Sequence, residues 1–126
     1  MWYVIEHFSD LRPVLQKVSE CLNPGGIFAF STPSASGVSA KYNTENFFQN
    51  SPSDHYTLWE PEECDAILQK FGFKVLKIVS TGQHPERFPY YENHPFKRKG
   101  LHYRFYSLLS RVCGLGDTFE VYCKKL

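Results

Sequence analysis

The chain has 126 residues, with 14 Lys and Arg against 13 Asp and Glu, which gives a net charge of +1. Its length suits one domain, and 42% hydrophobic with 21% charged residues is typical of a globular protein. A near-neutral balance argues against a general attraction to nucleic acid or to an acidic membrane, so we expect neither partner. No apolar run reaches the ~18 residues of a membrane span. The first ten residues include Glu6, His7 and Asp10 rather than a secretory signal, so we expect a cytoplasmic protein.

The four cysteines lack the spacing of a metal or redox motif. No two of Cys21, Cys64, Cys113 and Cys123 are separated by two residues, as zinc knuckles and thioredoxin-type sites require. Cys21 and Cys64 fall on the apolar faces of predicted helices, and Cys123 falls on the apolar side of a predicted strand. Free thiols at such positions behave as small apolar side chains. We predict reduced, structural cysteines and no disulfide framework.

The first half of the chain predicts a helix, a buried strand and a long loop. Asp10 is a candidate N-cap for a helix with apolar residues at helical spacing, and Asn23-Pro24-Gly25-Gly26 ends it. The continuous apolar run over 27–30 is typical of a strand buried on both faces, as in a parallel sheet flanked by helices. The segment 31–59 has no clean periodicity, and so long a loop is unusual in a compact domain unless it has a function.

The second half alternates helices and strands. The first predicted elements are a helix from Pro61 to Gly72, with an inner stripe of Cys64, Ile67, Leu68 and Phe71, and a strand over 73–79. An irregular segment over 83–100 follows and ends in the basic residues Lys97-Arg98-Lys99. The last elements are a short amphipathic helix, marked by Phe105, Leu108, Leu109 and Val112, and a strand over 118–124. This alternation predicts a layered α/β fold.

Several short motifs follow one another along nearly the whole chain. They are Trp2-Tyr3-Val4-Ile5-Glu6-His7-Phe8, Leu22-Asn23-Pro24-Gly25-Gly26, Ser31-Thr32-Pro33, Asp54-His55-Tyr56 with Trp59, Phe71-Gly72-Phe73, the stretch from Thr81 to Pro89, and Gly116-Asp117-Thr118-Phe119-Glu120-Val121-Tyr122. Together they resemble the class I S-adenosylmethionine-dependent methyltransferases. In that family a hydrophobic segment ending in Glu-His follows the fourth strand, and a Leu-x-Pro-Gly-Gly turn precedes the fifth.

One part of the family pattern is missing from this chain. The family binds its cofactor at a Gly-rich turn after the first strand, whereas the only Gly-x-Gly here, Gly114-Leu115-Gly116, precedes the last predicted strand. The resemblance therefore implies that residues 1–126 form a single domain, the C-terminal half of a methyltransferase domain. We expect a truncated, three-layered, Rossmann-like α/β fold. Its mixed sheet would have the family strand order five, seven, six, with the last strand antiparallel to its neighbours.

The resemblance also suggests roles for individual residues. Trp2 and Tyr3 correspond to cofactor-contacting positions, although Trp2 could instead anchor a helix start on the core. His7 and His55 are candidate catalytic residues, and Asp54 beside His55 could support a general base, with a plain loop histidine as the alternative.

Glu6 and Arg87 are assigned to the substrate side, and no metal is predicted. Some family members bind a divalent metal through Glu-x-x-Glu-His and a later His, but Tyr3 stands where the first Glu would be. Three ligands, Glu6, His7 and His55, can still hold a metal, so this alternative stays open beside a structural or proton-relay role. Arg87 with Lys97-Arg98-Lys99 and Arg104 could meet an acidic substrate, but a solvated charge run is the preferred interpretation.

Two functional hypotheses follow. The first is an S-adenosylmethionine-dependent methyltransferase acting on a small-molecule or glycan-type acceptor, in which this chain alone binds the cofactor weakly or not at all and is inactive. The second is a non-catalytic α/β fragment or partner subunit. Its strand over 26–31 would lack a neighbour, and an exposed apolar edge favours a homodimer or a strand-swapped oligomer.

Overall fold

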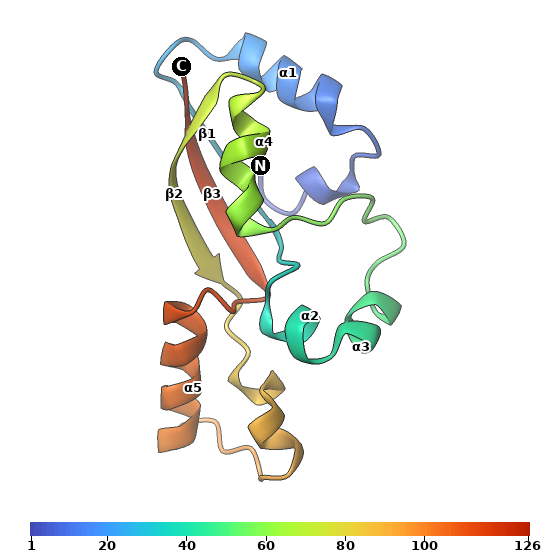
Figure 1. The fold of residues 1–126 in the computed structure, drawn as a ribbon, viewed down its shortest axis with the longest axis vertical. Helices are drawn as coiled ribbons and strands as arrows, with labels where there is room; N and C mark the ends of the chain where they lie inside the picture. The colour runs from blue at the N-terminus through green and yellow to red at the C-terminus, as the bar shows by residue number, and fades with distance from the viewer.

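A three-stranded sheet forms the centre of the computed structural model, which describes residues 1–126 (Figure 1). Its strands are β1 (Ile27–Pro33), β2 (Phe73–Thr81) and β3 (Thr118–Lys125), in the spatial order β1-β3-β2. The central β3 runs antiparallel to both neighbours. The predicted order, with the last strand between the other two and opposed to them, is confirmed.

The sheet is held by alternating apolar side chains on one of its faces. Phe28 and Phe30 of β1 lie two residues apart and point to the same side, as Phe119, Val121 and Cys123 of β3 do. These five side chains are buried in one core cluster, and Phe30 pairs with Val121 across the strands. The residues of β3 that alternate with Phe119, Val121 and Cys123 are half-buried or exposed, so the two faces of this strand are unequal.

Two helices cover this face of the sheet. They are α1 (Leu11–Cys21), which Asp10 caps by accepting a hydrogen bond from the Arg12 amide, and α4 (Cys64–Gln69), preceded by a 3₁₀ turn over Pro61–Glu63. Leu15 of α1 and Leu68 of α4 belong to the same core cluster, and both helices lie on the same side of the strands in Figure 1. Within this chain the sheet thus has two layers, and the third layer that we expected on its other face is not formed by these residues.

The segment predicted to be a long loop contains regular structure. β1 extends to Pro33, and two short helices follow, α2 (Val38–Tyr42) and α3 (Thr44–Gln49). Sequence periodicity missed them because helices of five and six residues present less than two full turns.

The last helix, α5 (Leu101–Val112), lies at the narrow end of the molecule, away from the sheet (Figure 1). It packs on a small second cluster of Val38, Phe88 and Leu115 through Tyr106 and Leu109. Phe105, Leu108 and Val112, which marked this helix in the sequence, are exposed. With 12 residues, α5 is the longest helix, and no helix has the length and apolarity that crossing a bilayer requires.

The cysteines divide into two buried and two exposed thiols. Cys64 and Cys123 are buried as predicted, whereas Cys21 is exposed, so its placement on the apolar face was wrong. Burial, with a smaller contribution from nearby Cys123, raises the pKa of Cys64 to about 12, and burial raises the pKa of Cys123 to about 11. Both buried thiols are therefore protonated at neutral pH and are poor nucleophiles.

A short stretch at the N-terminus adds to the free edge of β1. The Met1 ammonium donates to the Ala29 carbonyl at 2.8 Å, Ser31 N donates to Met1 O at 3.0 Å, and Tyr3 N donates to Ser31 O at 3.1 Å. The resulting bridge between Trp2 and Ser31 is parallel. The chain then turns at Tyr3, the only residue other than glycine with a positive φ (52°), into a 3₁₀ turn over Ile5–His7.

Candidate functional site

A large hollow lies at the edge of the sheet where β1 and β2 end and β3 begins. Its volume is about 1110 Å³, and it is lined by Pro33 at the end of β1, Thr118 at the start of β3 and His84 three residues after β2. The helices α2 and α3 and the following segment through Leu58 form the other walls. Ligands of open α/β sheets bind outside the carboxyl ends of the strands, so this hollow stands where the fold predicts a site.

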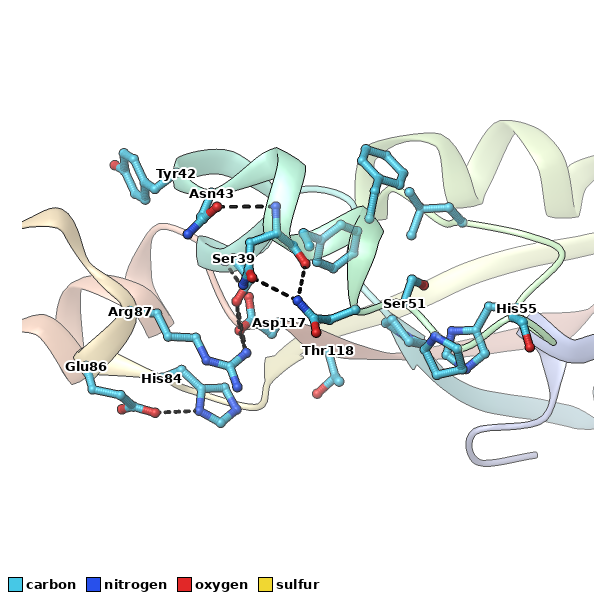
Figure 2. A pocket seen from close by; sticks show the side chains of 18 of the residues that line it. Ser39, Tyr42, Asn43, Ser51, His55, His84, Glu86, Arg87, Asp117 and Thr118 are labelled. Carbon is cyan, nitrogen blue, oxygen red and sulfur yellow. Dashed lines mark hydrogen bonds and ion pairs between the residues drawn. The ribbon is translucent and has the colours of Figure 1, made fainter. Parts of the chain in front are cut away.

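Asp117 organises one end of the hollow (Figure 2). Its carboxylate, on a residue only 8% exposed, accepts hydrogen bonds from Ser39 N at 2.8 Å, from Ser39 Oγ at 2.6 Å and from Arg87 Nη1 at 2.6 Å. Gly37 makes this approach possible, because a Cβ there would lie 2.7 Å from the Asp117 Cα. The start of α2, the start of β3 and the segment after β2 are thereby joined.

The ion pair leaves Arg87 with little net charge to offer a ligand. The lining residues with full charges are Arg87, Asp117, Glu86 and Glu92. His84 contacts Glu86 through Nδ1 at 2.9 Å. Burial opposes ionisation of Glu86, but the hydrogen bond with His84, its own backbone amide and the charges of His84 and Arg87 outweigh burial and lower the pKa of Glu86. The hollow is therefore not a positively charged site.

Uncharged polar groups and aromatic rings make up much of the remaining lining. The polar ones are amides and hydroxyls on α2, α3 and the loop that follows, namely Ser39, Asn43, Asn46, Asn50, Ser51 and Ser53, and the rings are those of Tyr42, Phe47, Phe48 and Tyr56. Amides and hydroxyls both donate and accept hydrogen bonds. This combination suits a ligand with many hydroxyl groups and some apolar surface.

His55 lies at the opposite end of the hollow from Arg87 (Figure 2) and is joined to His7. The two imidazole rings are in edge-to-face contact with their centroids 4.8 Å apart. The Asp54 carboxylate contacts His7, with Oδ2 3.1 Å from Nδ1, and the Asp54 carbonyl oxygen is also 3.1 Å from that nitrogen. The sequence had suggested that Asp54 supports its neighbour His55; the structure places it on His7 instead.

Glu6 lies behind the two histidines and does not line the hollow. It is 1% exposed, and neither of its carboxylate oxygens has a hydrogen-bond partner. One ligand atom from each of Glu6, His7 and His55 lies within 4.8 Å of the others. Buried carboxylates are normally paired or bound to a metal, so these three donors could coordinate a divalent cation.

Comparison with known proteins identifies the family. A family model described as a methyltransferase domain matches residues 1–78, more than half of the chain. The chain belongs to this methyltransferase family. No curated protein matches the sequence.

Two solved structures support the same fold. One is a chain from the complex between the Trm112 methyltransferase activator and a methyltransferase of Haloferax volcanii, with a TM-score of 0.60 and 16% identity over 98% of this chain. The other is described as a sarcosine dimethylglycine methyltransferase from Galdieria sulphuraria, with a TM-score of 0.53 and 12% identity over 98% of this chain. In both cases this methyltransferase-family chain covers 51% of the other chain, about half its length.

Neither the single Gly-x-Gly nor the two residues predicted to contact the cofactor line the hollow. The single Gly-x-Gly serves packing, because a Cβ on Gly116 would clash with the Thr81 carbonyl oxygen, while Gly114 ends α5 with a φ of +67°. Trp2 and Tyr3, predicted to contact the cofactor, are both about half exposed and lie outside the hollow, so Trp2 is not a core anchor either. Trp2 Nε1 donates to Glu120 Oε1 at 3.4 Å.

Sequence reasoning about this methyltransferase-family chain missed Ser39 and Asp117. In the sequence, Asp117 stands out only as part of the motif of the last strand, and Ser39 lies in the segment 31–59, for which a loop is predicted. An acidic residue directly before an alternating strand was an available signal, because a carboxylate that becomes buried there needs donors from other segments. No sequence pattern indicated that Ser39 supplies two of them.

Proposed function

We propose that this chain forms the acceptor-binding side of an S-adenosylmethionine-dependent methyltransferase, and that its acceptor is a neutral, hydroxyl-rich small molecule or glycan. The hollow at the strand ends carries this proposal. Its wall contains two pairs of ionisable side chains at bonding distance, Arg87 with Asp117 and His84 with Glu86, and is otherwise rich in amides and hydroxyls. Aromatic rings on α2, α3 and the loop supply flat apolar faces for a sugar-like ring.

The charge of the lining argues for a neutral acceptor. Asp117 neutralises Arg87, and Glu86 and Glu92 add negative charge beside it. A phosphate or carboxylate would meet these carboxylates without an unpaired cation to compensate, and like charges at short range are repulsive. Arg87 thus contacts substrate as a hydrogen-bond donor held in place by Asp117, since its Nη2 and Nε are not engaged by this pair.

His55 is the candidate general base, and His7 is its positioning residue. Methyl transfer to an alcohol requires that the hydroxyl proton leave the oxygen, and a neutral imidazole can accept it. His55 lines the hollow, and its ring packs against the His7 ring in an edge-to-face contact. His7 in turn is oriented by Asp54. A chain of side chains therefore sets the orientation of the base.

The methyl donor is proposed to be bound outside this chain's own residues. S-adenosylmethionine supplies an electrophilic methyl group when it is bound to the family's enzymes. Because no glycine-rich cradle is formed by residues 1–126, we expect the isolated chain to bind the cofactor weakly or not at all and to show no turnover. A glycan or small-molecule acceptor should still bind, because residues of this chain line a hollow of about 1110 Å³.

Ligand binding to the ¹⁵N-labelled chain tests the acceptor class. A panel of neutral sugars and matched sugar phosphates is titrated, and amide and side-chain shifts are followed by NMR. We expect neutral sugars to move the signals of Ser39, Asn46 and Arg87, and the His55→Gln variant to bind them equally, since a base is not needed for binding. Phe48→Ala should weaken binding, and Phe105→Ala, an exposed ring on α5, is its control. Preferential binding of sugar phosphates would refute the neutral-acceptor assignment.

A second proposal concerns the edge of β1. Met1–Tyr3 cover only its later part, and a shallow hollow of about 400 Å³ remains beside Ile27 and Phe28, lined also by Val18 and Leu22 of the α1 region. Unpaired apolar edges favour pairing with another strand. We propose that this edge forms a homodimer or strand-swapped oligomer, as a non-catalytic partner subunit would. The Haloferax chain was solved with an activator protein, which makes a heterologous partner the rival occupant.

Sedimentation velocity distinguishes these cases. We expect a dimer at high concentration, converted to monomer by Ile27→Lys, with Leu76→Lys on the exposed side of β2 as the matched control. A monomer at all concentrations would contradict self-association.

A further inference from the structure

The charge of the chain is strongly segregated, although its total is close to zero. Residues 93–116 contain five basic residues, Lys97, Arg98, Lys99, Arg104 and Arg111, and no Asp or Glu. The rest of the chain has 9 Lys and Arg against 13 Asp and Glu. The net charge of +1 is therefore the sum of a basic segment and an acidic remainder. It does not describe the local charge on the surface of either part.

Within this basic segment, α5 turns an apolar stripe to the outside. Leu101, Phe105, Leu108 and Val112 follow the spacing i, i+4, i+7, i+11, which places them on one helix face. They are 82%, 59%, 62% and 75% exposed. The opposite face makes the contacts with the protein through Tyr106, Leu109 and buried Ser110. Within residues 1–126, the apolar stripe is therefore not the face by which α5 packs on the rest of the protein.

The basic residues stand beside the stripe and at one end of it. Arg104 and Arg111 lie seven residues apart and share one flank of the helix. Lys97-Arg98-Lys99 precede the first turn, and all five basic side chains are exposed. Figure 1 shows α5 on the outside of the narrow end, with the loop that carries the three consecutive basic residues at its tip.

The geometry points to a peripheral membrane-docking function for α5, with a bilayer surface rich in anionic lipids as its occupant. A helix with an apolar stripe and basic flanks lies in the interface, with the stripe among the acyl chains and the cations at the headgroups. Membrane docking of this kind requires both the apolar stripe and the basic residues beside it, and α5 has both. The inference revises the sequence-based expectation of no membrane partner, which rested on the total charge, and it does not depend on the proposed acceptor.

Other occupants match only part of this surface. A nucleic acid would attract the cations, but its phosphate backbone offers no apolar surface to four large side chains. An acidic protein would need an apolar groove in addition to its carboxylates. A bilayer presents anionic headgroups above a continuous apolar layer, and a convex helix at the end of a molecule can reach it without a shaped partner.

Docking would also orient the hollow. The Phe88 ring packs on Tyr106 of α5 with centroids 4.9 Å apart, and Phe88 directly follows Arg87. The helix and one wall of the hollow are therefore mechanically connected. A bound α5 would hold the hollow at a fixed short distance from the membrane surface.

Vesicle flotation of the full 126-residue chain tests the inference. The probes are vesicles of phosphatidylcholine alone and of phosphatidylcholine mixed with phosphatidylglycerol. We expect binding to the anionic vesicles, little binding to the neutral ones, and about fivefold weaker partitioning for each basic residue of 97–99 replaced by Gln. The Leu101→Gln/Leu108→Gln variant should lose at least tenfold in partitioning at unchanged charge.

Matched variants separate a specific surface from general stickiness. Lys70→Gln/Lys74→Gln/Lys77→Gln removes three exposed cations elsewhere, and Leu76→Gln removes an exposed apolar residue from β2; both should bind as the unaltered chain does. Circular dichroism confirms that each variant is folded. Binding that survives the stripe variant, equal loss in the Lys70/Lys74/Lys77 variant, or a chain that binds single-stranded DNA but not vesicles would each overturn the inference.

Discussion

Arg87 and Asp117, 30 positions apart in the chain, are joined by a contact of 2.6 Å between Nη1 and Oδ2. Asp117 is nearly buried and also holds Ser39 through two hydrogen bonds, whereas about half of the Arg87 side chain is exposed. The pair is therefore asymmetric: Asp117 fixes three segments of the hollow, and Arg87 forms the part of this network that a ligand can reach.

Replacing the two partners should have unequal effects on stability. Asp117→Ala leaves the Ser39 amide and hydroxyl without an acceptor, so we expect the free energy of unfolding to fall by about 2–3 kcal/mol. Arg87→Met removes a half-exposed cation and should cost no more than about 1 kcal/mol. Urea denaturation measures both, with Arg12→Met as the control for an exposed ion pair. Equal losses for the two variants would contradict the assigned asymmetry.

The two glycines of Gly114-Leu115-Gly116 should differ in their tolerance to alanine. A Cβ on Gly116 meets the backbone of Thr81, which cannot move without breaking the sheet edge, so Gly116→Ala should cost about 3 kcal/mol. A Cβ on Gly114 would meet no other atom, so the only cost of Gly114→Ala is the strain of an alanine at a positive φ. We expect this strain to lower the free energy of unfolding by about 1 kcal/mol. Thermal denaturation of both variants checks this. A mild Gly116→Ala would mean that the close approach to Thr81 is not required.

Two of the four thiols should react in the native protein. Cys21 and Cys113 are exposed and should be alkylated at pH 8, while Cys64 and Cys123 should react only after unfolding. Because folding raises the pKa of both buried thiols above the ordinary 9.0, to about 12 and about 11, their contribution to stability is complete below pH 9. That contribution declines as the pH rises through 9 towards 12. Mass spectrometry after alkylation counts the sites, and four native adducts would contradict the burial.

Glu6→Met distinguishes a buried, unpaired carboxyl from a metal ligand. We propose that no metal is needed, in which case removing this unpartnered group should raise the free energy of unfolding by about 1–2 kcal/mol. Divalent cations should then leave the melting temperature of the unaltered chain unchanged. If Zn²⁺ or Mn²⁺ raised the melting temperature of the unaltered chain but not of the Glu6→Met variant, the proposal would be contradicted. Glu6, His7 and His55 would then be assigned to a metal site.

The sequence predicted the sheet better than it predicted the site. Periodicity and capping located α1, α4 and the three strands, because their apolar residues repeat against a common core. The short helices α2 and α3 and the outward direction of the α5 stripe were not predictable in this way. Hydrophobic spacing reports that residues share a face, and it does not report whether that face meets the protein or the solvent.

The candidate site depends on contacts between distant segments, which a single sequence does not encode locally. The sequence named His7 and His55 as separate candidates, and the contact between their rings is specified only by the fold. The sequence left open whether Asp54 supports its neighbour His55, and in the structure Asp54 contacts His7 instead. The network of Asp117 with Ser39 follows from a buried carboxylate recruiting donors, which only the fold specifies.

Isothermal titration calorimetry of the chain with S-adenosylmethionine tests the central claim most directly, namely that these residues supply the acceptor side of a methyltransferase without its donor site. A neutral sugar that binds in the NMR titration serves as the positive control for a folded, binding-competent sample. The account predicts heat for the sugar and no measurable binding of S-adenosylmethionine. Micromolar binding of S-adenosylmethionine to the isolated chain would contradict it.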